Sequence, residues 1–205
     1  MHANAKPANV EMLPEGWFSD ADIAAYKSLY ESVPVGGTTA ELGVWQGRSL
    51  CAIAEVIRLR RLRVHAIDTF GGTEGERDVV HDCGGKLREV FESNLARFNI
   101  RAQVEVHTGS TGSLAANFSH ASLDLVFIDA DHRYEQTAAD VRAWLPKVKP
   151  GGVLCGHDYK RPWRHLWGRD RSGVKRAVDE ALGKKQVRLF PGSSVWCYRT
   201  MAVSV

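Results

Sequence analysis

Acidic residues and histidines gather at the ends of two apolar runs in the second half of the chain. The first run covers residues 123–128 and the second covers 153–156. The polar residues that follow them are Asp129, Asp131, His132, His157 and Asp158. Two carboxylates and an imidazole in one cleft can hold a divalent cation such as Mg²⁺ or Mn²⁺. We therefore predict that Asp129, His157 and Asp158 are the ligands of a metal ion.

A bound cation lowers the pKa of a hydroxyl group that it contacts and orients the oxygen for attack. His132 follows Asp129 by three residues, and an imidazole with its ordinary pKa of about 6.5 suits removal of the hydroxyl proton. We assign the catalytic roles to Asp129 and His132. Two simpler interpretations stay open: Asp129 binds only an amino group of a cofactor, and His157 and Asp158 only cap the next loop.

A glycine-containing turn follows the first apolar run. Glu41, Gly43 and Gly47 have the spacing E-x-G-x-x-x-G, and a helix is expected from about Ser49. Glycine allows sharp turns and a close approach to a ligand, and the N–H groups of a helix start face that ligand. A dinucleotide fold has G-x-G-x-x-G at this turn, and here Trp45 replaces its second glycine. The turn therefore favours a nucleoside-bearing cofactor other than NAD.

Asp68 ends the next apolar run, 25 residues after Gly43. An acid at this place can accept hydrogen bonds from ribose hydroxyls. Folds that bind NAD and folds that bind S-adenosylmethionine (SAM) both use such a group, so Asp68 does not separate the two. The simpler interpretation of Gly43 and Gly47 is an ordinary strand–helix turn.

Strand-like and helix-like stretches alternate from residue 38 onward and position these motifs. The expected strands are 38–42, 64–67, 103–107, 123–128 and 153–156, and the expected helices are 48–60, 85–98, 111–118, 134–147 and 173–182, after a first helix near Ser19. Such alternation predicts a parallel sheet with helices on both faces, whose strands end at one ligand-binding edge. The tail reads as a β-hairpin around a Pro-Gly-Ser-Ser turn. We predict an α/β fold: a Rossmann-like, doubly wound, mostly parallel seven-stranded sheet with a C-terminal antiparallel β-hairpin.

Length and composition are those of one ordinary globular domain over residues 1–205, with residues 1–14 as a loose N-terminal arm. The net charge of +3 is too small to argue for nucleic acid. No apolar run has the length of a signal peptide or a membrane span, so we expect a cytoplasmic protein. The four cysteines include no C-x-x-C pair, and they predict neither a disulfide framework nor a zinc site.

The chain resembles class I SAM-dependent methyltransferases, especially the bacterial group of macrocin-type and other antibiotic-sugar O-methyltransferases. The resemblance covers nearly the whole chain. Its motifs are Glu-Gly-Trp-Phe-Ser at 15–19, Glu-Leu-Gly at 41–43, Ile-Asp-Thr-Phe at 67–70, Asp-Ala-Asp-His at 129–132, Lys-Pro-Gly-Gly at 149–152, Gly-His-Asp at 156–158 and Val-Lys-Arg-Ala at 174–177. The turn at 129–131 also looks like the metal-binding turn of catechol-type O-methyltransferases.

This resemblance implies roles for individual residues. Those that it places around SAM are Glu41, Gly43, Trp45 and Ser49 at the methionine half, Asp68 at the ribose, and Gly109 and Ser110 along the adenine. Asp129 would be the first metal ligand. Catechol-type enzymes carry Asp-Asn where this chain has His157 and Asp158, which leaves the metal and its presence open. They place a lysine base where this chain has His132.

The implied activity is SAM-dependent transfer of a methyl group to a hydroxyl of a small molecule, with assistance by a divalent metal. Two alternatives stay open: a NAD-dependent oxidoreductase and a SAM-binding protein without catalysis. Residues 70–85 and 159–173 are the expected substrate walls, and the second interleaves tryptophans with arginines. These side chains suit an anionic, sugar or aromatic acceptor. We expect no membrane partner, nucleic acid is not favoured, and a homodimer is compatible with the sequence.

Overall fold

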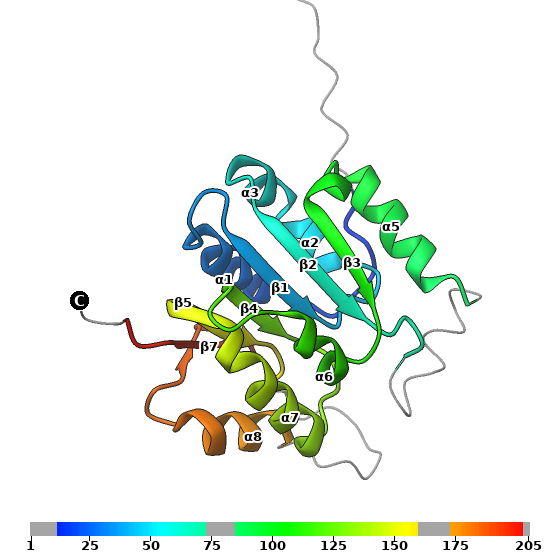
Figure 1. Cartoon of the computed structure of the whole chain (residues 1–205). Helices are drawn as coiled ribbons and strands as arrows, with labels where there is room; N and C mark the ends of the chain where they lie inside the picture. Colours follow the sequence, from blue (N-terminus) through cyan, green and yellow to red (C-terminus); the bar gives the residue numbers. More distant parts are fainter. Residues whose placement is uncertain (1–11, 73–84, 160–172, 203–205) are drawn as a thin grey trace, which may run out of the picture.

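The computed structural model describes residues 12–72, 85–159 and 173–202, and its centre is one seven-stranded sheet (Figure 1). The strands are β1 (Thr38–Leu42), β2 (Arg63–Asp68), β3 (Val104–Thr108), β4 (Leu123–Ile128), β5 (Val148–Gly156), β6 (Arg188–Leu189) and β7 (Trp196–Arg199). Their order across the sheet is β3-β2-β1-β4-β5-β7-β6. The pairs among β1 to β5 are parallel, and β7 runs antiparallel to both β5 and β6. The predicted fold class is confirmed.

Helices cover both faces of this sheet (Figure 1). They are α1 (Asp20–Glu31), α2 (Arg48–Ala52), α3 (Ala54–Leu59), α5 (Leu87–Arg97), α6 (Thr111–Leu114), α7 (Tyr134–Trp144) and α8 (Gly173–Leu182). One apolar core contains buried side chains of α1, α2, α3 and α5, and the other contains those of α7 and α8. The helix expected at 48–60 is divided, because Ile53 leaves the helical conformation with φ −112° and ψ 19°.

Helix α1 connects the start of the described chain to its end. Ser19 and Asp22 form a capping box, as the spacing predicts. The same Asp22 carboxylate accepts hydrogen bonds from the Ser193 hydroxyl at 2.7 Å and the Ser194 N–H at 2.9 Å. The turn of the C-terminal hairpin is therefore fixed to the first turn of α1.

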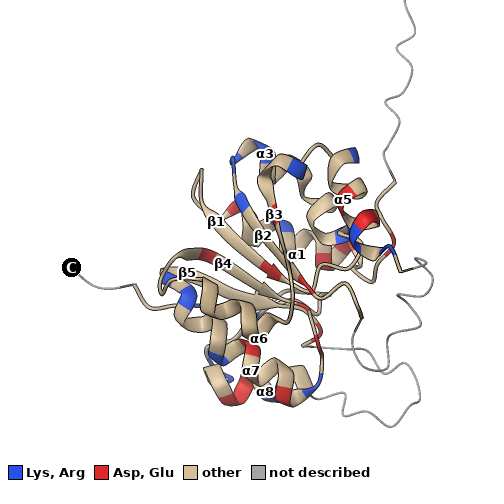
Figure 2. Ribbon diagram, turned by 45° about the vertical axis from the view of Figure 1, so that its right-hand side comes forward, with Lys and Arg blue, Asp and Glu red and all other residues tan. Residues whose placement is uncertain are grey.

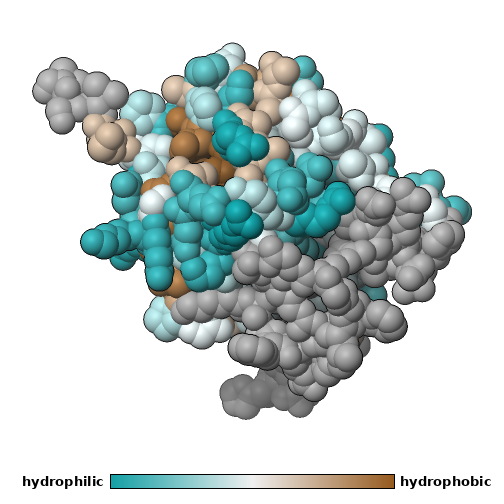
Figure 3. Space-filling model, turned by 90° about the horizontal axis from the view of Figure 1, so that it is seen from below, coloured by the Kyte–Doolittle hydropathy of each residue, from teal (hydrophilic) through white to brown (hydrophobic). Residues whose placement is uncertain are grey.

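The two ends of the strands differ in composition. Acidic residues lie at the carboxyl ends of the central strands (Figure 2). Seen from below, the described surface is mostly hydrophilic with one small hydrophobic patch (Figure 3). Among the described residues, no helix is long and apolar enough to span a membrane. The acidic residues therefore indicate a site at the carboxyl ends of the strands.

Candidate functional site

A cavity of about 610 Å³ opens at the carboxyl ends of the strands. Its walls include the following residues proposed from the sequence: Glu41, Gly43, Trp45, Ser49, Asp68, Gly109, Ser110, Asp129 and His132. Gly47, His157 and Asp158 do not line it. The topology therefore brings the turns after β1, β2, β3 and β4 to one cavity, whose volume is typical of a small-molecule site.

Gly43 and Gly47 shape the turn after β1. Both have a left-handed backbone, with φ of +82° and +83°, which favours glycine. A Cβ on Gly43 would lie 2.2 Å from the carbonyl oxygen of Asp129, and a Cβ on Gly47 would lie 2.9 Å from the Phe91 ring. Packing against the protein itself thus requires both glycines, and Gly43 brings the turn against the strand end that carries Asp129.

Asp68 holds the same turn from the end of β2. Its Oδ2 accepts the N–H groups of Val44 at 2.9 Å and Trp45 at 3.0 Å, and its Oδ1 accepts the Phe70 N–H at 2.7 Å. A carboxylate has about four acceptor positions, so Asp68 retains capacity for a further donor. Its role at a ribose stays a prediction, and the structure adds a role in positioning the turn.

Glu41 lies beneath the cavity and is only 1% exposed. The Tyr26 hydroxyl donates to its Oε2 and the Ser49 hydroxyl to its Oε1, both at 2.5 Å. Burial raises the pKa of Glu41 to about 8 against the lowering effect of these two hydrogen bonds. Ser49 thus acts on Glu41, and the acid carries a proton for much of the neutral pH range.

Trp45 adopts a left-handed backbone with φ of +43°, which is costly for a bulky residue and is found preferentially at functional sites. Its ring lies against Trp17 with 4.5 Å between the centroids. The Trp45 Nε1–H is buried and has no hydrogen-bond acceptor among the described residues. Trp17 is 67% exposed, and both rings line the cavity. The pair is a ready stacking surface for a planar or sugar group.

The turn after β3 closes the cavity on another side. The Gly109 N–H donates to the Asp68 carbonyl oxygen at 3.0 Å. The Ser110 hydroxyl caps α6 by accepting the Ser113 N–H at 3.3 Å. Both residues therefore line the cavity as expected, and their contact with an adenine stays a prediction.

Asp129, His132 and Asp158 form a compact cluster beside the cavity, with ligand atoms within 4.8 Å of one another. His132 Nε2 lies 3.4 Å from Asp129 Oδ1 and 3.0 Å from Asp158 Oδ2. Burial lowers the pKa of His132, but the two carboxylates raise it to about 10. In this charge state the ring is a proton donor, and its role as a base stays a prediction.

His157 reaches the same carboxylates from the other side. Its Nδ1 lies 3.8 Å from Asp129 Oδ1 and 3.5 Å from Asp158 Oδ1, and the ring is 7% exposed. The Nε2 atom lies 3.4 Å from Asp22 Oδ2. A histidine that binds a metal usually has a carboxylate or carbonyl at its second nitrogen. His157 thus lies beside both predicted carboxylate ligands, whereas the group whose ligand atoms all lie within 4.8 Å of one another contains His132 in its place. Metal binding at these residues stays a prediction.

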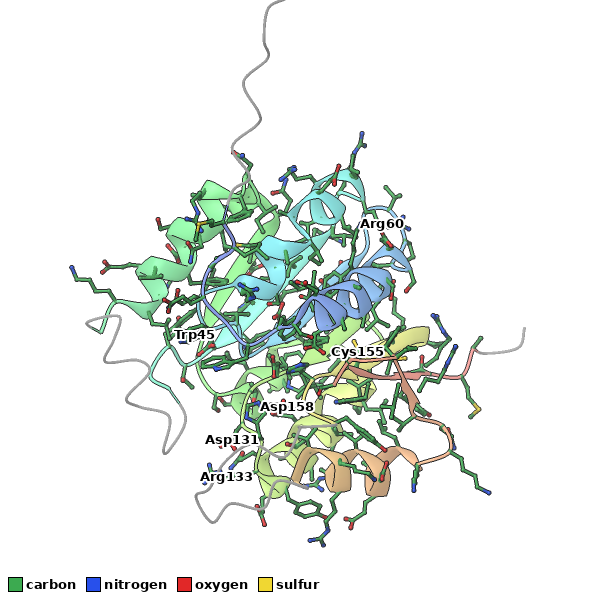
Figure 4. All side chains as sticks on the ribbon, turned by 180° about the vertical axis from the view of Figure 1, so that it is seen from behind. Trp45, Arg60, Asp131, Arg133, Cys155 and Asp158 are labelled. Carbon is green, nitrogen blue, oxygen red and sulfur yellow. The ribbon has the colours of Figure 1, made fainter. Side chains whose placement is uncertain are left out.

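Asp131 follows the same strand end but faces a different partner. Its carboxylate accepts Arg133 Nε at 3.0 Å and Arg133 Nη2 at 2.7 Å. Burial raises the pKa of Asp131, and the hydrogen bonds from Arg133 outweigh this and lower it. In Figure 4, Trp45, Asp131 and Asp158 lie on one side of the molecule, whereas Arg60 lies at the opposite end. The pair places a guanidinium group in the cavity wall.

Several lining residues have no role in the sequence-based prediction. They are Trp17, Phe18, Arg48 and Arg133. Trp17 and Phe18 belong to the motif at 15–19. This motif is the sequence signal that could have pointed to them as cavity residues. Arg48 holds the segment before α1 by donating to the Pro14 carbonyl at 2.8 Å. The spacing of residues in the sequence does not predict that this segment lies at the cavity. Of the expected substrate walls, residues 73–84 and 160–172 lie outside the described residues.

Residues 40–159 match the model of a family described as a methyltransferase domain. The match covers more than half of the chain and includes the carboxyl ends of all strands from β1 to β5. No curated protein sequence matches the chain.

Solved structures that share this fold include the following three. The O-methyltransferase NovP has 19% sequence identity and a TM-score of 0.66, covering 88% of this chain and 80% of NovP. CalS11, a TDP-rhamnose 3'-O-methyltransferase, has 22% identity and a TM-score of 0.59, covering 87% and 78%. An O-methyltransferase from Bacillus cereus in complex with SAH has 20% identity and a TM-score of 0.61, covering 92% and 84%. At these identities the likeness supports the fold.

Proposed function

Because the chain belongs to the methyltransferase-domain family, we propose that it transfers a methyl group from SAM to a hydroxyl group of a small molecule. The observation that carries this proposal is the cavity at the carboxyl ends of the strands, where Glu41, Asp68 and Asp129 converge. This is the place at which open α/β sheets bind nucleoside-bearing ligands. The family match sets aside the NAD-dependent oxidoreductase alternative.

The residues present fit SAM. When bound, SAM supplies an electrophilic methyl group on its sulfonium. The walls offer carboxylates from Glu41 and Asp68 for the amine and hydroxyl groups of such a ligand, and the Trp45 ring offers an aromatic surface. A cation in the cavity favours the ionised form of Glu41. The chain therefore holds the donor through polar groups that its own turns position.

The cluster at Asp129 fits a divalent cation by its chemistry. Its two carboxylates, with the imidazoles of His132 and His157 beside them, are oxygen and nitrogen donors of the kind that hold Mg²⁺ or Mn²⁺. A cation held there lowers the pKa of an acceptor hydroxyl. Asp22 orients His157 through the ring nitrogen that faces away from the cluster. His132 is the group placed to exchange a proton beside Asp129.

The acceptor is proposed from the cavity wall. Trp17 and Trp45 offer aromatic faces, and Arg133 offers a guanidinium group. Aromatic faces suit sugars and planar rings, and a guanidinium suits an anionic group. CalS11, which shares the fold, is a TDP-rhamnose 3'-O-methyltransferase. We propose an anionic, sugar or aromatic small molecule as the acceptor. The cytoplasmic location and the homodimer stay predictions.

Isothermal titration of the purified chain with SAM, S-adenosylhomocysteine and NAD, each with and without Mg²⁺ or Mn²⁺, tests the proposal. We expect micromolar binding of the two adenosyl ligands and none of NAD. A transfer assay with small hydroxyl compounds then follows. Binding of NAD alone would overturn the cofactor assignment, and SAM binding without turnover of any acceptor would favour the non-catalytic alternative. Lys27→Gln changes a half-exposed ion pair on α1. It serves as the control for effects of mutagenesis and purification that do not involve the site.

A further inference from the structure

A second group of potential metal ligands lies on the sheet at the β2–β3 edge. It consists of His65, Glu105 and His107. His65 and Glu105 are register partners across the two strands, and His107 follows Glu105 by two residues in β3. Since side chains alternate along a strand, all three lie on the same face of the sheet. None of them lines the cavity.

The distances within this group suit a single ion. His65 Nδ1 lies 3.0 Å from His107 Nε2 and 3.5 Å from Glu105 Oε2, and His107 Nε2 lies 3.6 Å from Glu105 Oε1. Ligand atoms bound tetrahedrally to Zn²⁺ at 2.0–2.2 Å lie about 3.4 Å from one another. The two distances to Glu105 match this spacing. The two imidazole nitrogens, 3.0 Å apart, have to move slightly apart to bind the ion.

The surroundings hold both rings in place. The Phe118 ring meets the His65 ring with 5.1 Å between centroids and the His107 ring with 5.7 Å. Both histidine side chains are 20% exposed, whereas Glu105 is 67% exposed. Glu105 supplies a negative charge beside the two rings.

We propose that His65, Glu105 and His107 bind one divalent transition-metal ion, with Zn²⁺ as the probe. Two imidazoles and one carboxylate favour such ions over Mg²⁺ and Ca²⁺, and a fourth position stays open for water. The ion joins β2 to β3, the outermost strand at this end of the described sheet. His107 stands two residues before Gly109, so the ion also fixes the strand that leads into the cavity wall. The alternative occupant of the same geometry is a hydrogen-bonded pair of histidines without metal.

Equilibrium dialysis and thermal unfolding of the full chain test this proposal, after removal of metals with EDTA. The measurements use Asp129→Asn as the background, because this substitution weakens the other cluster. In that background we expect one equivalent of Zn²⁺ at micromolar concentration and a higher Tm that EDTA reverses. His107→Gln in the same background loses that equivalent and the rise in Tm. His120→Gln, at an exposed histidine outside the group, leaves both unchanged.

Glu105→Gln guards against a folding defect, because this exposed side chain is replaced without change of shape. We expect at least tenfold weaker Zn²⁺ binding with unchanged Tm in EDTA. Co²⁺ in place of Zn²⁺ gives a visible spectrum that reports the coordination geometry of the ion, and the spectrum disappears in His107→Gln. Equal Zn²⁺ stoichiometry and affinity in the background, His107→Gln and Glu105→Gln proteins would overturn the proposal. Loss of methyl transfer in the background variant does not bear on it, so the two proposals fail separately.

Discussion

One cluster of histidine and carboxylate lies in the turns after β4 and β5, another lies on β2 and β3, and the two differ in what surrounds them. The cluster of Asp129, His132 and Asp158 has two carboxylates for one imidazole and lies beside a cavity of about 610 Å³. The β2–β3 group has two imidazoles for one carboxylate and does not line this cavity. The first has room for an organic ligand beside a hard cation, and the second has the donors of a softer ion. The two proposed sites therefore differ both in their donor atoms and in the space beside them.

The largest expected difference between the two clusters is in catalysis. Asp129→Ala removes a cavity-lining carboxylate that lies beside His132 and His157. We expect methyl transfer to fall by about 100-fold or more. Glu105→Gln, the corresponding loss of charge in the β2–β3 group, keeps transfer within about twofold, because Glu105 and its ion-pair partners His65 and His107 do not line the cavity. Initial rates with SAM and a turned-over acceptor measure both. Near-normal turnover in Asp129→Ala would remove the mechanism proposed here.

Asp22 provides the next comparison, because it supports His157 in one cluster and has no counterpart in the other among the described residues. Burial raises the pKa of Asp22, but the His157 ring and the hydroxyls of Ser19 and Ser193 hold it well below its usual range. For Asp22→Asn we expect about 10- to 100-fold lower transfer with a raised requirement for Mg²⁺ or Mn²⁺.

The matched control for Asp22→Asn is Ser193→Ala. It removes one hydrogen bond from Asp22 but leaves the His157 contact. We expect a loss of about 1–3 kcal/mol in the free energy of unfolding with a normal metal requirement. If Ser193→Ala raised the metal requirement as much as Asp22→Asn, the role of Asp22 would be structural only.

The last expected effect is on stability rather than on methyl transfer, and it concerns Glu41, the buried acid beneath the cavity. Its pKa is about 8 when folded, raised by burial, and about 4.3 when unfolded. Between these two pH values, Glu41 is therefore protonated in the folded protein and ionised in the unfolded chain. Stability from this group is full below about pH 4, declines as the pH rises, and is lost above pH 8. The slope is at most about 1.4 kcal/mol per pH unit.

Chemical denaturation of the unliganded protein from pH 5 to pH 9 measures this slope. In Glu41→Gln we expect a flatter dependence than in the wild type, and Lys27→Gln serves as the control that keeps the wild-type slope. Parallel curves for wild type and Glu41→Gln would show that Glu41 is ionised in the folded protein throughout, and the cavity would then hold no buried neutral acid.

The sequence predicted the sheet more completely than the site. Alternating strands and helices fix the order of a parallel sheet, and turn glycines such as Gly43 mark the ends of its strands. The contacts of Asp22 with His157 and with the hairpin turn could not be predicted, because the capping box with Ser19 already explains an acid at this position. The register of β2 on β3 was also unknown, so His65 could not be placed opposite Glu105. The cysteine spacing predicted no zinc site, and the proposed ion site contains no cysteine.

The contact between Asp22 and the hairpin turn has a consequence for the order of folding. Ser193 lies 171 residues along the chain from Asp22, and contacts of such separation form late and slowly. During synthesis α1 leaves the ribosome long before β7 does. Asp22 can acquire its full set of partners, and so hold His157 in its final environment, only after the hairpin has been made. In the nascent protein the environment of His157 is therefore complete only after β7, the last strand of the described sheet, has been made.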